Sequence, residues 1–124
     1  NLLEEIRIGY LLHRLGSSNK APSGYEILKL ATRGSARILG RNDIGSLEVG
    51  KAADLFMVDS RELALVGTSQ DPKSLLATVG LHRPVDYTVI NGKVVVRKGR
   101  LTTVDEEKVI ARANELVTEL LKKA

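Results

Sequence analysis

The chain has 124 residues, the length of one ordinary domain; 43% of them are apolar, but only 3% are aromatic. It contains no cysteine, which excludes disulfides, thiol nucleophiles and cysteine-based zinc sites and suits a cytoplasmic protein. The net charge of +4 is mild and scattered along the chain, which argues against a nucleic-acid partner. No stretch is long and apolar enough to cross a bilayer, so we expect no membrane partner.

The first third of the chain predicts two amphipathic helices. Residues 2–15 carry apolar side chains at three- and four-residue spacing, with acidic residues in the first turn. Ser23 and Glu26 have capping-box spacing, which predicts a second helix over residues 23–39 that ends at Gly40. Its expected buried stripe is Ile27, Leu30, Ala31, Gly34 and Ile38. The small residues of this stripe, alanine and glycine, would let another element approach closely.

The middle of the chain predicts a strand and a short helix. Residues 53–58 are a near-continuous apolar run of strand length, which predicts burial on both faces. Asp71 followed by Pro72 predicts a helix start, because proline at the first helical position loses no needed donor. This helix would end at Gly80.

Residues 86–101 predict a β-hairpin. Asn91-Gly92 is the dipeptide that supplies two positive-φ residues for a type I′ turn. In that register Val89 faces Val94, Tyr87 faces Val96, and Asp86 faces Arg97 as an opposite-charge pair. Beyond the hairpin, Thr103 and Glu106 predict the cap of a terminal helix. Its apolar stripe is Val109, Ile110, Ala113, Val117, Leu120 and Leu121.

Residues capable of chemistry are few and scattered. His13 and His82 lie far apart in sequence, whereas a zinc hydrolase site needs three or more converging ligands, so neither is assigned as a ligand. Asp54, Asp59 and Asp86 lie in or near strands, where paired carboxylates could act as acid and base. A structural role is the preferred interpretation, with Asp54 hydrogen-bonded to turn backbone and Asp59 ending a strand.

The run from Gly45 to Lys51 has the glycine spacing of a phosphate-binding loop. Ala52 stands where such a loop requires serine or threonine, and a strand rather than a helix follows. That interpretation is therefore rejected. We assign no catalytic, cofactor-binding or metal-binding residue within this chain.

Four stretches nevertheless carry a resemblance to a known family: residues 1–7 (NLLEEIR), 31–40 (ATRGSARILG), 44–59 (IGSLEVGKAADLFMVD) and 85–96 (VDYTVINGKVVV). They resemble the C-terminal segment of metal-dependent amidohydrolases, in the branch of deaminases and chlorohydrolases. Within that branch they look most like the 8-oxoguanine deaminase and hydroxyatrazine aminohydrolase group.

The resemblance implies an α+β class: the last helices of a (β/α)8 amidohydrolase barrel, part of the small β-sandwich domain, and a C-terminal helix. It implies terminal barrel helices over 1–40, small β-domain strands with an inserted helix and the 91–92 hairpin over 41–104, and the C-terminal helix over 105–124. The family's metal ligands would all lie upstream, so zinc or iron is expected in the full-length enzyme but not in this segment. Asn1 and Leu2 would lie nearest to the active site.

The implied function is hydrolysis of C–N bonds, by deamination, in cyclic amidines such as purines or triazines, with a metal-activated hydroxide as nucleophile. A helical pattern that begins at Leu2 favours a fragment that is inactive alone. Its expected partner is the missing upstream barrel portion, and its exposed apolar helices make a homo-oligomer a second candidate assembly. The alternative is a stand-alone structural or binding module that reuses the β-domain.

Overall fold

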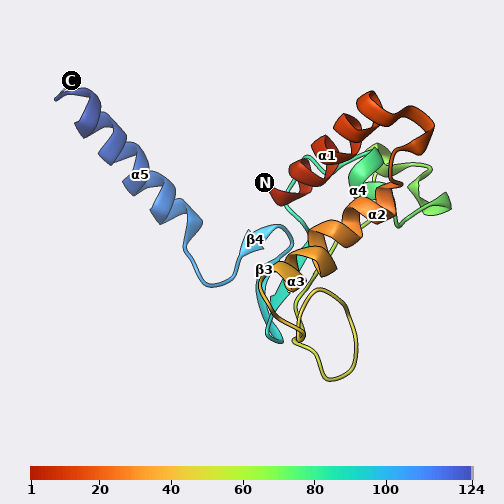
Figure 1. The fold of residues 1–124 in the computed structure, drawn as a ribbon. Coiled ribbons are helices and arrows are strands. Elements are labelled where there is room, and N and C mark those ends of the chain that lie inside the picture. Colours follow the sequence, from red (N-terminus) through yellow and green to blue (C-terminus); the bar gives the residue numbers. More distant parts are fainter. Residues whose placement is uncertain (124) are drawn as a thin grey trace.

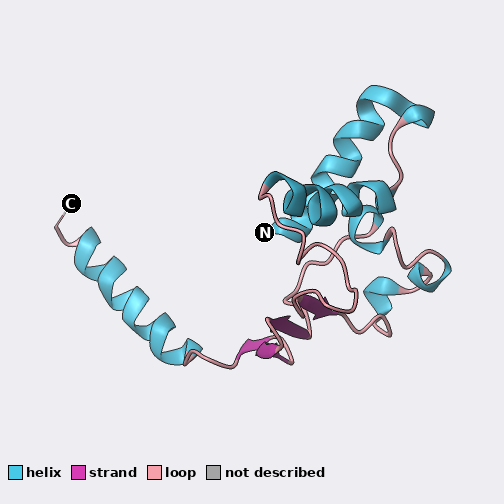
Figure 2. Ribbon diagram, turned by 60° about the horizontal axis from the view of Figure 1, so that its bottom comes forward, coloured by secondary structure: helices cyan, strands magenta, loops and turns pink. Residues whose placement is uncertain are grey.

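The computed structural model describes residues 1–123, which form a group of helices, a small antiparallel sheet and one helix that stands apart (Figures 1 and 2). The α-helices are α1 (Leu2–Ser17), α2 (Gly24–Lys29), α3 (Ser35–Ile38), α4 (Leu75–Thr78) and α5 (Glu106–Leu121). The strands are β1 (Leu55–Met57), β2 (Tyr87–Ile90), β3 (Lys93–Arg97) and β4 (Arg100–Leu101). Short 3₁₀ turns cover Ser18–Lys20, Leu63–Leu65 and Thr68–Gln70. Within the described residues no helix combines the length and apolarity needed to cross a membrane.

The two predicted N-terminal helices are confirmed, and the second begins with the expected capping box. The Ser23 hydroxyl accepts from the Glu26 backbone N–H, and the Glu26 carboxylate accepts from the Ser23 N–H at 2.7 Å. The helix is not uniform, because α2 and α3 are joined by a π-helical turn, η2 (Leu30–Gly34). Within this turn the Thr32 hydroxyl donates to the Leu28 carbonyl at 2.8 Å, a bond that competes with the regular backbone ladder.

The core joins α1 and α2 to α4, although α4 lies far along the chain. Its buried residues are Ile6, Ile27, Leu65, Leu75, Leu76, Ala77 and Leu81. Gly24 makes the closest approach: a Cβ at this position would lie 2.8 Å from Ser74 Cβ and 3.1 Å from Ala77 Cβ. The first turn of α2 can therefore rest directly on α4.

The expected buried stripe of the second helix is only partly correct. Ile27 is buried, but Leu30 and Ile38 are exposed within the described residues. Close approach was expected at Ala31 and Gly34, yet a Cβ on Gly34 would meet only ordinary contacts. The tight contact falls instead at buried Ala36, against which Gly45 packs.

The sheet has the order β1-β2-β3-β4, and each neighbouring pair is antiparallel. The predicted hairpin is confirmed: both residues of the Asn91-Gly92 turn have positive φ, and Val89 lies opposite Val94. The rest of the predicted register is wrong. A β-bulge between Thr88 and Val89 shifts the pairing, so that Tyr87 lies opposite Arg97 rather than Val96. The predicted cross-strand pair of Asp86 with Arg97 is lost with it.

Two further predictions need correction. The strand in residues 53–58 is the short edge strand β1, and its Phe56 and Met57 side chains are 42% and 48% exposed rather than buried on both faces. The helix predicted from Asp71 begins later, at Leu75, because residues 71–74 form a turn in which the Ser74 N–H donates to the Asp71 carbonyl. Its predicted end at Gly80, where φ is +80°, is confirmed.

Helix α5 begins at a different cap from the predicted one. The Asp105 carboxylate, not the Thr103 hydroxyl, accepts from the first turn, at 3.1 Å from the Lys108 nitrogen. Glu106 turns back instead and accepts the Leu101 N–H at 2.8 Å. No residue of α5 is buried, and the helix projects from the end of β4 away from the rest of the chain (Figure 1).

Candidate functional site

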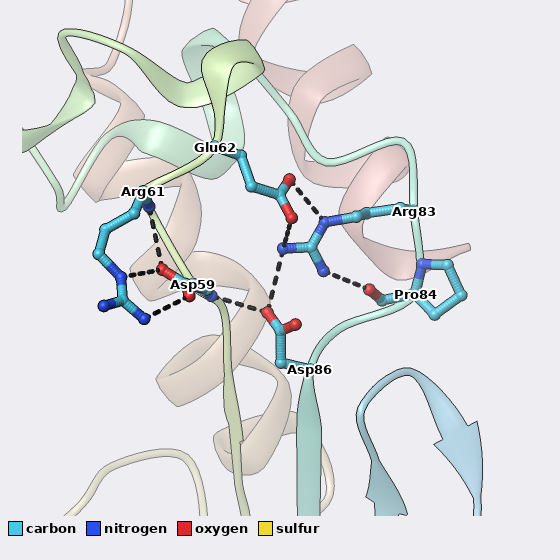
Figure 3. A network of polar contacts seen from close by, with 6 residues as sticks. All are labelled: Asp59, Arg61, Glu62, Arg83, Pro84 and Asp86. Carbon is cyan, nitrogen blue, oxygen red and sulfur yellow. Dashed lines mark hydrogen bonds and ion pairs between the residues drawn. The ribbon is translucent and has the colours of Figure 1, made fainter.

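Charged side chains gather where β1 ends and β2 begins, and we call Asp59, Arg61, Glu62, Arg83 and Asp86 the Arg83 cluster (Figure 3). The Arg83 guanidinium, 29% exposed, is its centre. Its Nε donates to Glu62 Oε2 at 2.8 Å, and its Nη2 lies 2.8 Å from Glu62 Oε1 and 3.0 Å from Asp86 Oδ2. Its Nη1 donates to the Pro84 carbonyl at 2.8 Å. Arg83 thus joins the segment after β1 to the segment before β2.

The two aspartates of the cluster hold backbone as well as charge. Asp86 Oδ2 accepts the Asp59 N–H at 2.7 Å, which together with the Arg83 guanidinium holds the pKa of Asp86 below its usual value. Arg61 donates to both carboxylate oxygens of Asp59: its Nε lies 2.9 Å from Oδ1 and its Nη2 lies 2.7 Å from Oδ2. These bonds and the Arg61 backbone N–H lower the pKa of Asp59 strongly.

The Arg83 cluster has a structural role: it holds the segment after β1 to the segment before β2. Each of its carboxylates accepts hydrogen bonds from a guanidinium, and the two aspartates are held ionised, which is unsuited to a general acid. The structural interpretation of Asp59 and Asp86 therefore agrees with the geometry. The sequence pointed to the wrong partner for Asp86: its arginine is Arg83, three residues away, and not Arg97. That short spacing was a usable signal, whereas nothing local to Arg83 indicated Glu62.

The other residues considered for chemistry are dispersed. Asp54 accepts from turn backbone as expected, but the turn is that of the hairpin: the donor is the Asn91 N–H, at 2.7 Å. His13 lies exposed on α1. Exposed His82 and Asn1 line one hollow of about 530 Å³, in which Glu106 supplies a carboxylate. Residue Leu2, adjacent to Asn1, is exposed and does not line it.

A second hollow of about 380 Å³ lies between α3 and the loop that follows it, and it is rich in arginine. The loop is closed by its own contacts: Lys51 Nζ donates to Ser46 Oγ at 2.6 Å and lies 3.5 Å from Glu48 Oε2. Arg33 reaches the same Glu48 carboxylate at 3.8 Å. Lys51 therefore binds side chains of its own loop. The element that follows the loop is the strand β1 and not a helix, which agrees with the rejection of a phosphate-binding loop.

The structure brings together no ligand set for a metal ion. Among residues 1–123, no group of three or more His, Asp or Glu side chains lies within reach of one ion. The described part of the chain therefore does not fit the zinc or iron expected in the full-length enzyme, and no catalytic step through a metal can be assigned to its residues.

Comparison with known proteins identifies the family. The pattern of the amidohydrolase family matches residues 1–95, so this chain belongs to the amidohydrolase family. It is 48% identical to hydroxydechloroatrazine ethylaminohydrolase of Pseudomonas sp. strain ADP, over 91% of this chain and 24% of the relative. It is 37% identical to 5-methylthioadenosine/S-adenosylhomocysteine deaminase of Pelotomaculum thermopropionicum, over 98% of this chain and 28% of the relative.

Solved structures agree with this assignment. Atrazine chlorohydrolase from Arthrobacter aurescens, complexed with zinc, is 37% identical with a TM-score of 0.83, over 93% of this chain and 26% of that one. An adenosine deaminase from Xanthomonas campestris with bound zinc is 29% identical with a TM-score of 0.83, over 98% of this chain and 28% of that one. The chain thus has the fold of one part of these enzymes and spans about a quarter of the length of the relatives it matches.

Proposed function

We propose that this chain is the C-terminal part of a metal-dependent amidohydrolase that hydrolyses C–N bonds in cyclic amidines, with purines and triazines as the leading substrate classes. The 48% identity to an ethylaminohydrolase carries this proposal, because it extends over nearly all of the chain. The deaminases among the relatives support the same reaction class. The zinc in two similar solved structures supports zinc as the metal of the whole enzyme.

In this proposal the segment builds the scaffold rather than the reaction centre. Large apolar side chains are uncovered on α1 and on the second helix, including Leu12, Leu30 and Ile38. The outer edge of β1 has no strand beside it within residues 1–123, although the strand is apolar. The upstream barrel portion is the proposed partner of these surfaces. The second helix would complete the barrel, and the sheet would form part of the small β-sandwich domain.

A chimera tests the proposal. The corresponding C-terminal quarter of the Pseudomonas ethylaminohydrolase is replaced by this chain, and the purified protein is assayed for zinc content and for turnover of a panel of amino-substituted triazines and purines. We expect a folded, zinc-loaded enzyme with measurable release of amine or ammonia. The same enzyme without the segment is the control and should fail to fold or to hold zinc.

The outcomes separate the parts of the proposal. A chimera that folds but does not retain zinc would contradict the scaffold role. A zinc-loaded chimera that turns over neither panel would contradict the substrate class. The stand-alone module has less support, because the relatives contain this segment as one continuous part of longer enzymes.

A further inference from the structure

The turn between β2 and β3 contains Asn91, and this is the one asparagine of the chain that is followed by glycine. The other asparagines all precede a residue with a side chain: Asn1, Asn19, Asn42 and Asn114. The backbone nitrogen of the following residue can attack an asparagine side-chain amide, and glycine hinders that attack least because it has no side chain. Both turn residues are exposed, and beyond the turn itself nothing lies within 4 Å of a Cβ built on Gly92. The surroundings therefore leave room for the five-membered ring that such an attack forms.

Two hydrogen bonds to the segment before β1 hold this turn in place. The Gly92 N–H, the group that would have to react, donates to the Ala53 carbonyl at 3.1 Å. The Asn91 N–H donates to Asp54 Oδ1 at 2.7 Å, and the charge of the carboxylate strengthens this bond. While both bonds persist, the Gly92 N–H is withheld from water and cannot lose its proton. The closed turn therefore protects Asn91.

The segment that provides this protection is short, exposed and at an edge of the sheet. Strand β1 has three residues and pairs only with β2 among the described residues. Ala53 and Asp54, which directly precede it, are both exposed. Segments with few buried contacts open locally at a lower free-energy cost than unfolding of the whole chain. Detachment of residues 53–54 would free the Gly92 nitrogen while the helical core stays folded.

We propose that Asn91 is a site of spontaneous deamidation and that residues 53–54 control its rate. When these residues detach, the Gly92 nitrogen loses its proton to water and attacks Cγ of Asn91. A new bond forms between this nitrogen and Cγ, the bond from Cγ to the side-chain nitrogen breaks, and that nitrogen takes up a proton and leaves as ammonia. Water then opens the cyclic imide at either carbonyl and leaves aspartate or isoaspartate at position 91. The reaction consumes one water, releases one ammonia and needs no other reactant.

Both products destabilise the turn in which they form. An aspartate at position 91 places a second carboxylate beside Asp54, where the like charges repel. An isoaspartate adds one carbon to the backbone of a two-residue turn whose length fixes the register of β2 and β3. Deamidation therefore weakens the hairpin and its contact with β1. This inference is independent of the proposed function, because it depends only on contacts within this chain.

Peptide mapping by mass spectrometry on the 124-residue chain, incubated near neutral pH, tests the site. We expect Asn91 to be the first asparagine to deamidate, with isoaspartate among the products. In guanidinium chloride, which removes the protection, Asn91 should react at least about tenfold faster than in the folded chain. A folded chain in which another asparagine reacts first, or a rate at Asn91 that guanidinium chloride leaves unchanged, would overturn the proposal.

Hydrogen exchange at the Gly92 amide, measured by NMR, tests the opening step without any substitution. The same local opening has to precede exchange and deamidation, so folding should slow the two processes by factors that agree within about threefold. Exchange that is slowed far more than deamidation would show that the reaction does not require release of the Gly92 N–H, and would overturn the control by residues 53–54.

Asp54→Ala tests the same control by removing the hydrogen bond to the Asn91 N–H. In the folded chain it should speed deamidation about tenfold, because a bond to a charged acceptor is lost, and in guanidinium chloride it should change nothing. The matched control is Asp71→Ala, which removes the same charge from an exposed residue outside the sheet and should change the rate by less than about twofold. An Asp54→Ala chain that reacts no faster than the wild type would contradict the proposal.

Ser23→Ala separates local opening from unfolding of the whole chain. It removes the capping box of the second helix and no contact of the sheet, so deamidation at Asn91 should change by less than about twofold. An acceleration equal to that of Asp54→Ala would show that the whole chain has to unfold first, and would overturn the role of residues 53–54. If Asp54→Ala fails to fold, this comparison and the exchange measurement decide the question.

Discussion

Replacing Gly45 by alanine tests how tightly the loop after α3 rests on the helix. Gly45 has φ of +87°, which an L-residue adopts only with strain. A Cβ added there would lie 2.9 Å from Ala36 Cβ, 3.1 Å from the Thr32 carbonyl oxygen and 3.2 Å from Arg33 Cα. Two of these atoms are backbone and cannot turn aside, so loop and helix would have to separate.

Gly50 provides a control with the same backbone angle. Its φ is also +87°, but nothing lies within 4 Å of a Cβ built on it. Gly50→Ala should therefore cost only the backbone strain, about 1–2 kcal/mol. Gly45→Ala should add a packing cost of about 1–3 kcal/mol, giving about 2–5 kcal/mol in total. The difference between the two variants isolates the contact with the helix.

Urea unfolding followed by circular dichroism at 222 nm gives the free energy of unfolding of both variants and of the parent chain. We expect Gly45→Ala to be less stable than Gly50→Ala by at least about 1 kcal/mol. Equal losses in the two variants would show that the loop does not press on the helix, and the reasoning from Cβ distances would be refuted.

Three other outcomes are expected. Ser23→Ala should lower the free energy of unfolding by about 1 kcal/mol through loss of the capping box, measured in the same urea assay, with a cost near zero as the contrary result. The pKa of Asp86 in the folded chain lies below its ordinary value of 3.8, so the ionised Asp86 stabilises the fold above that pH and this contribution is lost as the pH falls below it. The melting temperature should therefore drop in this acid range, and Arg83→Gln should make the drop smaller. An unchanged drop in the variant would contradict the tethering role of Arg83. In the chimera, His13→Ala and His82→Ala should leave the zinc content intact, and loss of zinc on either change would show an unrecognised ligand.

Local chemistry made parts of the fold predictable from sequence. The Asn91-Gly92 turn and the Ser23 capping box each depend on residues within four positions, and both appear as expected. The bulge beside Val89 was not predictable in this way, because Val94, Val95 and Val96 are three successive valines and the sequence does not show which of them is the extra residue. A local turn, not a helix, follows Asp71, because α4 starts only where Leu75 can enter the core.

In the candidate site, too, the contacts between nearby residues were predictable from sequence and those between distant residues were not. The structural role of Asp59 was inferable from its place at a strand end, and the structure adds the two hydrogen bonds from Arg61 that hold its carboxylate ionised. The contact between Arg83 and Glu62 was not inferable, since it joins residues 21 positions apart through the course of the intervening loop. Burial was the least predictable property, because an apolar stripe indicates that a face requires cover and not which segment covers it.

The packing of α4 against α1 has a consequence for the order of folding. The core closes only when Leu75, Leu76 and Leu81 reach Ile6, so 69 to 75 positions of chain have to be spanned before the first helix gains its main contacts. Pairing of β2 with β3, by contrast, needs only a two-residue turn. The hairpin should therefore form early and the helical core late, since closing a long loop is the slower step. A chain divided between α3 and α4 would leave each piece with an incomplete core.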